Sequence, residues 1–437
     1  MSLLLIFGAL QIVIAQQPAS TDSRIYDIAV APSPDRIETD IKKLVSFGTR
    51  NTMSDTVSDT RGIGAARRWI ADEFQKISDA CNGCLQVVVQ KELVQGDPNT
   101  RIKEDTWIVN VMAIKKGKAY PNSYVIMSGD IDSRASSSTD ATTDAPGAND
   151  NASGMAGVIE AARVLSQYDF SASMVFVGLS GEEQGLYGGK IMARQAKADG
   201  WDIIGVLNND MIGNIEGVDG VIDNSSFRVF SEPTPVTETD RQRSRRRFYG
   251  GEVDGVSRQL ARYVDKMTAT YMTNLNAKMI YRLDRFGRGG HHRPFNDEGY
   301  AGIRIMETHE NYTRQHQDIR VENGIAYGDV IEGVNFEYAA KLTAVNAISM
   351  AGLAWGPLAP KNVMIGGAVQ PSTTLRWEAS DDSNIAGYKI YWRDTTAPQW
   401  TNSRWVGEVS EFTLENIVID NYLFGVAAVA KDGNESV

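Results

Sequence analysis

The sequence predicts an α/β domain over residues 25–352, a mostly parallel mixed sheet sandwiched by helices, followed by an all-β sandwich over residues 357–437. From Thr106 to Gly352, strand-like apolar runs alternate with segments of helical periodicity, which is the pattern of a largely parallel sheet covered by helices. In the last part, short alternating runs are separated by turn residues, as in a β-sandwich. The length of 437 residues exceeds that of one average domain, so at least two are expected.

Composition and charge are those of an ordinary globular protein and argue against some partners. Hydrophobic residues make up 42% of the chain and charged residues 23%, as in most soluble proteins. The formal net charge of −11 argues against nucleic acid or an anionic membrane as the main partner. The segment Arg241–Arg247 holds five arginines in seven residues. It follows two prolines and a polar run, so we expect a solvated loop, with a lid or contact segment as the alternative.

The N-terminal stretch, residues 1–15, predicts a signal peptide. Its apolar run, Ser2–Ala15, has about the length of a signal-peptide core and is too short for a comfortable membrane span. Small residues near Ala15 suggest a cleavage point, although the only positive charge before the run is the terminal amine. No later segment has about 18 uninterrupted apolar residues, the length that a spanning helix needs. We therefore expect a secreted or periplasmic protein without a membrane span.

The first part of the α/β domain contains two expected helices and the only two cysteines. The helices, Asp35–Phe47 and Gly62–Ile77, both place apolar residues at helical spacing. Cys81 and Cys84 follow them in the arrangement Cys-Asn-Gly-Cys. In an exported protein this spacing predicts a small local disulfide, whereas a zinc or redox role would need a partner motif that the sequence lacks. A structural role is favoured.

Strands and helices then alternate along the chain. The expected strands are short runs of apolar and β-branched residues, namely Trp107–Ile114, Tyr124–Ser128, Met174–Leu179, Ile203–Asn208, Phe227–Phe230 and Ile303–Met306. The expected helices are longer and amphipathic, namely Gly154–Gln167, Leu186–Ala198, Val253–Met272 and Tyr327–Met350. This order is that of consecutive βα units, which build a parallel sheet.

The C-terminal segment resembles a fibronectin type III domain. Trp377 lies in an early expected strand, and a Gly-Tyr-x-Ile-Tyr-Trp strand follows at Gly387–Trp392. The resemblance implies an adhesion or spacing module, with contact to a surface or a carbohydrate, and no catalytic residue. A final strand would begin at about Val437, so we expect an incomplete sandwich or a fragment.

Chemically active side chains gather where the expected strands end. The carboxyl ends of strands in an open α/β fold border the crevice in which ligands bind. Two adjacent glutamates after one strand would repel each other unless a cation or a shared proton separates their roles. One acidic residue at such a place is more often a helix cap, but six acidic residues at successive strand ends predict a metal site. The acidic residues are Asp130, Asp132, Asp150, Glu182, Glu183 and Asp210, and all four histidines fall in one later window, at His291, His292, His309 and His316.

Five motifs in this region resemble those of the M28 family of zinc aminopeptidases. The resemblance covers about Thr106 to Gly352 and implies the phosphorylase/hydrolase-like zinc exopeptidase fold, with two zinc ions and a peptide substrate. The motifs are Pro-Gly-Ala-Asn-Asp-Asn-Ala-Ser-Gly at 146–154, Leu-Ser-Gly-Glu-Glu-Gln-Gly-Leu-Tyr-Gly at 179–188, Leu-Asn-Asn-Asp-Met-Ile-Gly at 207–213, His-Arg-Pro-Phe-Asn at 292–296 and Arg-Gln-His-Gln-Asp at 314–318.

The same resemblance implies a role for each of five residues. Asp150 would bridge the two metals, Glu183 and His316 would complete one metal site, Asp210 would hold the other, and Glu182 would be the general base. Chemically, a bridging carboxylate keeps two cations about 3.5–4 Å apart, so that they activate one water. The general base then transfers a proton from that water to the leaving amine, and the acidic pocket suits the N-terminal ammonium of a peptide.

The chain departs from the family pattern in its second metal site. The family usually has Gly-His-x-Asp where this chain has Gly129-Asp130-Ile131-Asp132, so Asp132 loses the histidine that it normally orients. If Asp130 still binds metal, the site would hold three carboxylates and favour manganese or magnesium over zinc. If it does not, the second site is weak or empty, and one zinc remains at Asp150, Glu183 and His316.

A second departure lies in the histidine window. The family usually has Asp-His before Pro-Phe, whereas this chain has His291-His292. We hypothesise that Asp130 and His291 face each other and have exchanged roles, with a solvent-facing loop position for His291 as the alternative. We place His292, and with it His291, on the substrate side of the pocket, and we interpret His309 as structural.

Three functions stay open. The leading one is an exported metallo-aminopeptidase. A glutaminyl cyclase or carboxypeptidase-type relative on the same fold is the enzymatic alternative, because cyclases of this kind bind one zinc. The third is an inactive binding protein, but the presence of both Glu182 and Glu183 argues against it, since a dead site has no chemical need for a general base.

Overall fold

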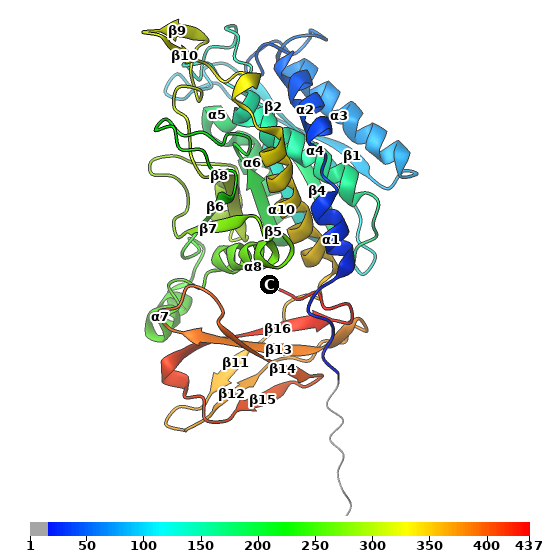
Figure 1. Ribbon diagram of the computed structural model, residues 1–437, viewed down its shortest axis with the longest axis vertical. Coiled ribbons are helices and arrows are strands. Elements are labelled where there is room, and N and C mark those ends of the chain that lie inside the picture. Colours follow the sequence, from blue (N-terminus) through cyan, green and yellow to red (C-terminus); the bar gives the residue numbers. More distant parts are fainter. Residues whose placement is uncertain (1–15) are drawn as a thin grey trace, which may run out of the picture. The chain divides into compact units, whose positions relative to one another are not determined.

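The computed structural model describes residues 16–437, which form two compact units (Figure 1). The larger unit comprises residues 23–355, and the smaller comprises residues 356–436 together with residues 16–22. The signal peptide expected at residues 1–15 lies outside the described residues. Among those that are described, no helix has both the length and the apolar character that crossing a bilayer requires.

The larger unit is built on an eight-stranded sheet whose strand order is β1-β2-β4-β3-β5-β8-β6-β7 (Figure 1). The central neighbours β4, β3, β5 and β8 run parallel, while β1, β2 and β6 add antiparallel pairings. The predicted mixed, mostly parallel sheet is therefore confirmed. The strands are β1 (Gln86–Val94), β2 (Thr106–Lys115), β3 (Tyr120–Asp130), β4 (Ala172–Leu179), β5 (Asp202–Asn209), β6 (Ser226–Ser231), β7 (Asn276–Ile280) and β8 (Gly302–Glu307).

Helices cover both faces of this sheet. Alternate side chains of a strand point to opposite faces, so Met174 of β4 joins the core under α1–α4, α8 and α10, while its neighbour Val175 joins the core under α6 and α9. Burial on both faces explains why the central strands read as continuous apolar runs. The helices are α1 (Ser23–Val30), α2 (Pro34–Val45), α3 (Gly62–Ala80), α4 (Gly154–Leu165), α5 (Glu182–Gly185), α6 (Tyr187–Ala198), α8 (Val256–Tyr271), α9 (His292–Asp297) and α10 (Phe336–Trp355), with the turn η1 (Ala148–Ser153) leading into α4.

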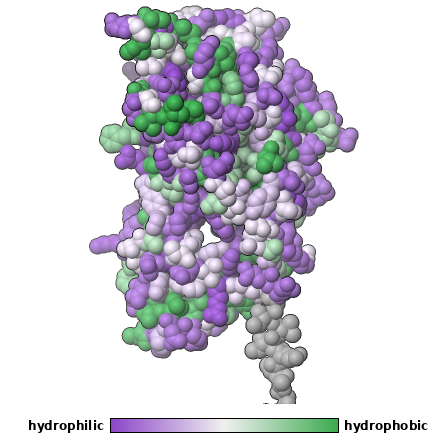
Figure 2. Space-filling view, in the orientation of Figure 1, coloured by the Kyte–Doolittle hydropathy of each residue, from purple (hydrophilic) through white to green (hydrophobic). Residues whose placement is uncertain are grey.

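The prediction for the last long helix was wrong at its start. The helix expected from Tyr327 begins at Phe336, because Tyr327 belongs to a short antiparallel hairpin of β9 (Arg320–Glu322) and β10 (Ile325–Tyr327). Figure 2 shows apolar side chains at the surface in the region of this hairpin, where Val321 and Ile325 are exposed. A strand pair this short lacks the length from which periodicity is recognised.

The arginine-rich segment forms a helix, so the loop prediction was wrong. Helix α7 (Asp240–Tyr249) contains no buried residue. It begins with a capping box, in which Thr239 Oγ1 accepts from the Gln242 N–H and the Gln242 side chain accepts from the Thr239 N–H. Such reciprocal bonds satisfy two otherwise unpaired backbone donors. A local cap, rather than packing, specifies this helix.

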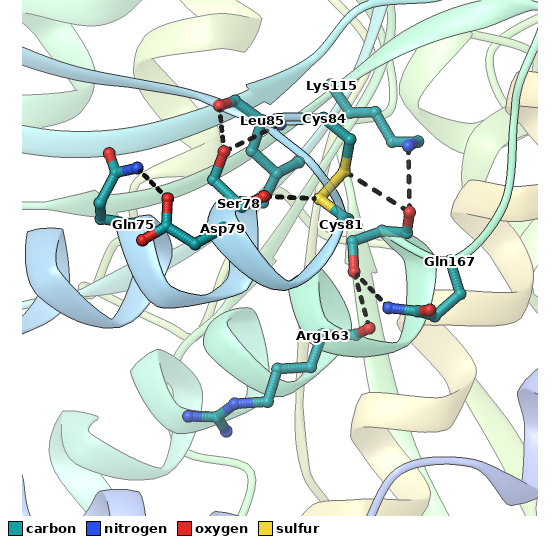
Figure 3. Close-up of a disulfide and its surroundings, with 10 residues drawn as sticks. Gln75, Ser78, Asp79, Cys81, Cys84, Leu85, Lys115, Arg163 and Gln167 are labelled. Carbon is teal, nitrogen blue, oxygen red and sulfur yellow. Dashed lines mark hydrogen bonds between the residues drawn. A yellow bond between two sulfur atoms is a disulfide. The ribbon is translucent and has the colours of Figure 1, made fainter.

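The predicted disulfide between Cys81 and Cys84 is confirmed (Figure 3). It lies just after α3, where the chain turns towards β1. Cys84 Sγ is 3.5 Å from the carbonyl oxygen of Ser166, which also accepts from Lys115 Nζ at 3.1 Å (Figure 3). The disulfide thus closes the short turn between the end of α3 and the start of β1, in keeping with the structural role that was expected.

The smaller unit consists of two three-stranded antiparallel sheets that share one hydrophobic core. Trp377 and Tyr388, two markers of the expected sandwich, are buried there with ring centroids 5.2 Å apart. The all-β second region is therefore confirmed. Its sheets are β11 (Met364–Gly366), β12 (Thr373–Arg376) and β15 (Glu411–Leu414), and β14 (Asn402–Gly407), β13 (Ile385–Asp394) and β16 (Tyr422–Ala430).

Candidate metal centre

The predicted carboxylates meet at one edge of the sheet. Asp130 is the last residue of β3, Glu182 and Glu183 begin α5 after two residues that follow β4, and Asp210 directly follows β5. Because β3 pairs in parallel with both β4 and β5, their carboxyl ends lie side by side. Asp150 reaches the same edge from the turn that leads into α4. The topology thus collects these residues from four separate segments.

Three side chains converge closely enough to share a metal ion, and we call them the ligand trio. His316 Nε2 lies 2.9 Å from Asp150 Oδ2 and 3.1 Å from Glu183 Oε1. The ligand atoms of these residues all lie within 4.8 Å of one another, and residues 16–437 contain no other such group. One imidazole and two carboxylates are donors that zinc accepts, and catalytic zinc sites use three protein ligands with one open position. The donor set therefore fits zinc.

The electrostatics of the ligand trio favour a bound cation. Burial lowers the pKa of His316, but the charges of Glu183 and Asp150 and the bonds to them outweigh it and raise this pKa to about 10. Burial would raise the pKa of Asp150, yet His316 holds it well below its ordinary value. Two carboxylates thus retain a proton on the imidazole between them. A divalent metal would supply the same positive charge, and its binding would release that proton.

The turn that carries the two glutamates is held by Asp132. Its Oδ1 accepts from the N–H of Glu182 at 3.2 Å, and its Oδ2 accepts from the N–H of Glu183 at 3.1 Å. Gly181 starts this turn with a φ of +74°, in the left-handed region that favours glycine. Burial and the charge of Glu183 raise the pKa of Glu182 well above its ordinary value. Asp132 therefore positions both glutamates through the backbone.

Two residues that sequence reasoning missed fix the loops around the site. Arg50 is fully buried and donates to the carbonyl oxygens of Ile131 and Gly147, each at 2.9 Å, so it joins two loops. Asp329 accepts from the backbone N–H of Asp150 at 2.6 Å and from that of the preceding residue at 2.8 Å. Neither lies at a strand end or in a motif, so the sequence carried no signal for them.

Asp130 and Asp210 are each bonded to other side chains of the protein. We call these two aspartates, together with their partners His291, Asn151 and Arg304, the paired half. Asp130 Oδ1 lies 2.5 Å from His291 Nδ1, and its Oδ2 accepts from Asn151 Nδ2 at 2.7 Å. His291 is fully buried, so the alternative of a solvent-facing loop residue was wrong. Direct contact between Asp130 and His291 is the arrangement that the exchange hypothesis requires.

Asp210 is paired with a buried arginine that sequence reasoning did not single out. Arg304 Nη2 lies 2.7 Å from Asp210 Oδ2, while its Nη1 donates to the carbonyl oxygen of Gly289 at 2.8 Å. Arg285 Nη2 is 4.0 Å from the same carboxylate oxygen. Burial raises the pKa of Asp210 to about 6, against the charge of Arg304. A signal was present, since an arginine inside the apolar run of β8 requires a buried partner.

Two further histidines lie outside the ligand trio. His292 is fully buried, and its Nε2 lies 2.7 Å from the carbonyl oxygen of Leu283. The contact of His292 with substrate stays a prediction, and the bond of its ring to Leu283 does not favour it. His309 is partly exposed, with its Nε2 3.9 Å from Asp223 Oδ2, in keeping with a structural role.

The chain is similar to known metallopeptidases. A model of peptidase family M28 matches residues 110–320. A probable zinc metalloprotease of Leptosphaeria maculans is 42% identical over 405 residues, which cover 92% of this chain and 93% of the relative. A second, from Pyrenophora tritici-repentis, is 38% identical over 418 residues, covering 95% and 96%.

Solved structures share the fold. The LapA aminopeptidase of Legionella pneumophila matches with a TM-score of 0.55 at 17% identity, covering 78% of this chain and 77% of that one. An aminopeptidase from Aneurinibacillus sp. strain AM-1 gives 0.52 at 14%, covering 74% and 95%. A glutaminyl cyclase of Porphyromonas gingivalis gives 0.50 at 14%, covering 74% and 98%. Since the fungal relatives match over nearly their whole length, the chain belongs to peptidase family M28 and is a zinc metalloprotease.

Proposed function

We propose that the protein is an aminopeptidase that removes N-terminal residues from peptides. The observation that carries this proposal is the ligand trio with Glu182 beside it, at the acidic edge of the sheet. The trio would hold zinc, and a bound zinc ion supplies Lewis-acid polarisation of a carbonyl and activation of water at neutral pH. Proton transfer and recognition of the substrate are carried out by the protein's own side chains.

Glu182 is the proposed general base. It accepts the proton that the attacking water gives up and transfers it to the nitrogen of the leaving amine. Asp132 fixes the direction of this side chain, because it binds the backbone N–H groups of Glu182 and Glu183. A proton-transfer group must lie within hydrogen-bond reach of its partner. The bonds from Asp132 therefore favour catalysis, because they fix the turn that carries Glu182.

The balance of charge favours an N-terminal over a C-terminal substrate group. The two arginines nearest the paired half, Arg285 and Arg304, are shared among three carboxylates. Arg285 Nη1 lies 2.8 Å from Glu310 Oε2, and Arg304 Nη1 lies 3.2 Å from Asp284 Oδ1, while Asp210 contacts both arginines. Because Arg228 also pairs with Glu310 at 2.9 Å, three cations face three anions and leave no spare positive charge for a substrate carboxylate. A peptide ammonium is the better complement, which supports an aminopeptidase over a carboxypeptidase.

Glutaminyl cyclisation is the second candidate. The observation in its favour is that one group of three ligands converges, since cyclases on this fold are expected to work with one zinc. An inactive binding protein is less compatible with a half-buried Glu182 held beside a complete ligand trio.

A substrate panel separates these functions. The full-length protein would be given aminoacyl-4-nitroanilides, the same compounds with an acetylated amine, and a peptide with N-terminal glutamine, before and after chelation and zinc restoration. We expect hydrolysis of the free-amine anilides alone, its loss on chelation and its return with zinc. Cyclisation of the glutamine peptide without anilide hydrolysis would establish the second candidate, and equal cleavage of acetylated compounds would contradict an aminopeptidase.

We further propose that the protein is exported and that its C-terminal unit is a fibronectin type III-like adhesion or spacing module. The apolar run Ser2–Ala15 and the shared core of the two small sheets support these two statements. N-terminal sequencing of protein recovered from the culture medium tests the first, with a start close to Gln16 as the expected result. Retention of the full-length protein on insoluble polysaccharide tests a surface contact.

A further inference from the structure

The paired half does not offer the second metal position that the family resemblance implies. That position would draw on Asp130, Asp150 and Asp210. Among the described residues, however, the only group of three or more ligand atoms that all lie within 4.8 Å of one another is the trio Asp150, Glu183 and His316. The three aspartates therefore do not converge on a common point, although the topology brings them to one edge of the sheet.

The length of the side chain explains part of this. The Nε2 nitrogen of an imidazole lies one bond, or ~1 Å, farther from the backbone than a carboxylate oxygen of aspartate. With aspartate at position 130, the donor atoms end short of the place that an imidazole would reach. Zinc tolerates little stretching, because its bonds to nitrogen and oxygen are about 2.0–2.2 Å long.

The histidine that faces Asp130 is closely packed, and its Nδ1 is the ring nitrogen that is hydrogen-bonded. His291 is fully buried, and its Nδ1 bonds to Asp130 Oδ1. Its ring packs on α6 at Gly189, where an added Cβ would lie 2.7 Å from His291 Cδ2. Only a glycine leaves room for the imidazole there. Since Asn151 occupies the other oxygen of Asp130, the carboxylate is engaged on both sides.

The other carboxylate is neutralised by a fixed cation. Arg304 has no exposed surface and is held by the carbonyl oxygen of Gly289 and the carboxylate of Asp284 as well as by Asp210. Arg285 adds a second guanidinium near Asp210. In a buried site, where charges are poorly screened, two guanidinium groups both neutralise this carboxylate and repel a divalent ion.

We infer that the centre is mononuclear: the ligand trio binds one zinc ion, and the imidazole of His291 and the guanidinium of Arg304 take the place of a second metal. Asp130 and Asp210 then serve as anchors of these two side chains. The inference rests on the zinc-dependent function proposed above, but it does not depend on which substrate the enzyme cleaves.

Metal stoichiometry tests this inference directly. The full-length protein would be saturated with zinc, freed of loose metal by gel filtration, and analysed by plasma mass spectrometry and native mass spectrometry. We expect one zinc per chain for the wild type. The double exchange Asp130→His with His291→Asp places an imidazole at position 130 and a carboxylate opposite it, and the added change Arg304→Met removes the guanidinium that is held against Asp210. We therefore expect the exchanged protein with all three changes to bind two zinc ions.

The outcomes are distinct. Two zinc ions in the wild type would overturn the inference, even if the exchanged protein failed to fold. One zinc ion in a folded exchanged protein, checked by circular dichroism, would show that the Asp130–His291 pair and Arg304 do not set the metal count. The single variant His291→Asp is the control and should keep one zinc, because no imidazole is gained. One zinc without anilide hydrolysis would leave this inference standing and overturn the aminopeptidase proposal.

Discussion

The ligand trio and the paired half are neighbouring groups that both contain carboxylates, but different partners balance the negative charge in each. In the trio, Asp150 and Glu183 share one imidazole whose side chain is 25% exposed. In the paired half, Asp130 and Asp210 are 2% and 3% exposed, and each has a protein partner of its own. The comparison teaches that partners, rather than carboxylates alone, decide where a metal can bind.

The physical reason is the cost of removing a charge from water. A buried carboxylate needs a cation or several hydrogen bonds to stay ionised. Arg304 is always protonated and held in place, so its charge cannot be exchanged for another. His316 carries an exchangeable proton, so a metal can replace that proton without leaving a carboxylate unpaired. The guanidinium groups held against Asp210 thus oppose a metal there, whereas the exchangeable proton of His316 leaves a place for one.

Removal of an imidazole from the ligand trio is expected to have the largest effect. We expect His316→Ala to lose zinc and to lower kcat/KM by more than about a hundredfold, since changes merely next to metal ligands already cost 10–100-fold. Zinc content and anilide hydrolysis would be measured together. His309→Ala is the matched control, because His309 lies outside the trio, and it should retain both. Full zinc occupancy in His316→Ala would show that the trio is not the site.

A change at Glu182 tests whether proton transfer and zinc binding are carried out by separate residues. We expect Glu182→Gln to lower kcat by about 10²–10⁴-fold, the usual contribution of a positioned general base. Zinc content should not change, since Glu182 is not among the trio. The exposed Glu92, which pairs with Arg194 on the surface, supplies the control Glu92→Gln. Wild-type kcat in the Glu182 variant would rule out the proposed base.

Arg304 tests the paired half through stability. Breaking a buried ion pair from one side costs about 3–5 kcal/mol, so we expect Arg304→Met to lower the free energy of unfolding by that order. Arg376→Met breaks the exposed pair with Glu411 and should cost less than about 1 kcal/mol. Urea unfolding of both variants provides the comparison. Equal losses would mean that Arg304 carries no special charge partner.

Asp132 links the turn of the glutamates to the sheet, and its effect should be smaller. In Asp132→Asn one oxygen is replaced by an amide that cannot accept from a backbone N–H. We expect zinc affinity to fall by about 10–100-fold, with a partial loss of kcat. Titration against a competing chelator measures the affinity. Because Asp140 accepts bonds only within its own exposed loop, Asp140→Asn should leave it unchanged.

A carboxylate without a full ion pair should give the smallest effect, as a pH dependence. Glu307 is buried beside the trio and accepts from Asn149 Nδ2 and from the Asn214 N–H. Burial raises its pKa to about 8, so the folded protein binds this proton more tightly than the unfolded chain. Stability is then greatest below the unfolded pKa and falls as the pH rises towards 8. Urea unfolding across this range should show a shallower fall in Glu307→Gln, and an unchanged slope would contradict it.

Much of the fold and the trio could be predicted because their signals are local. The run Met174–Leu179 is recognisable as a buried strand, and parallel strands must bring their carboxyl ends together. The histidine of the trio followed from a motif. By contrast, His291 lies 161 positions from its partner Asp130, and Arg304 lies 94 positions from Asp210. Hydrophobic periodicity does not encode such contacts. The family pattern indicated only that Asp130 and His291 had exchanged residue types.

The central claim is best tested by anomalous diffraction from zinc-saturated crystals, recorded on both sides of the zinc absorption edge. We expect one anomalous peak per chain, between Asp150, Glu183 and His316, with His291 still on Asp130 and Arg304 still on Asp210. A second peak of comparable height between Asp150 and Asp210 would contradict the account, because it would place a metal where the protein's own side chains are held to replace it.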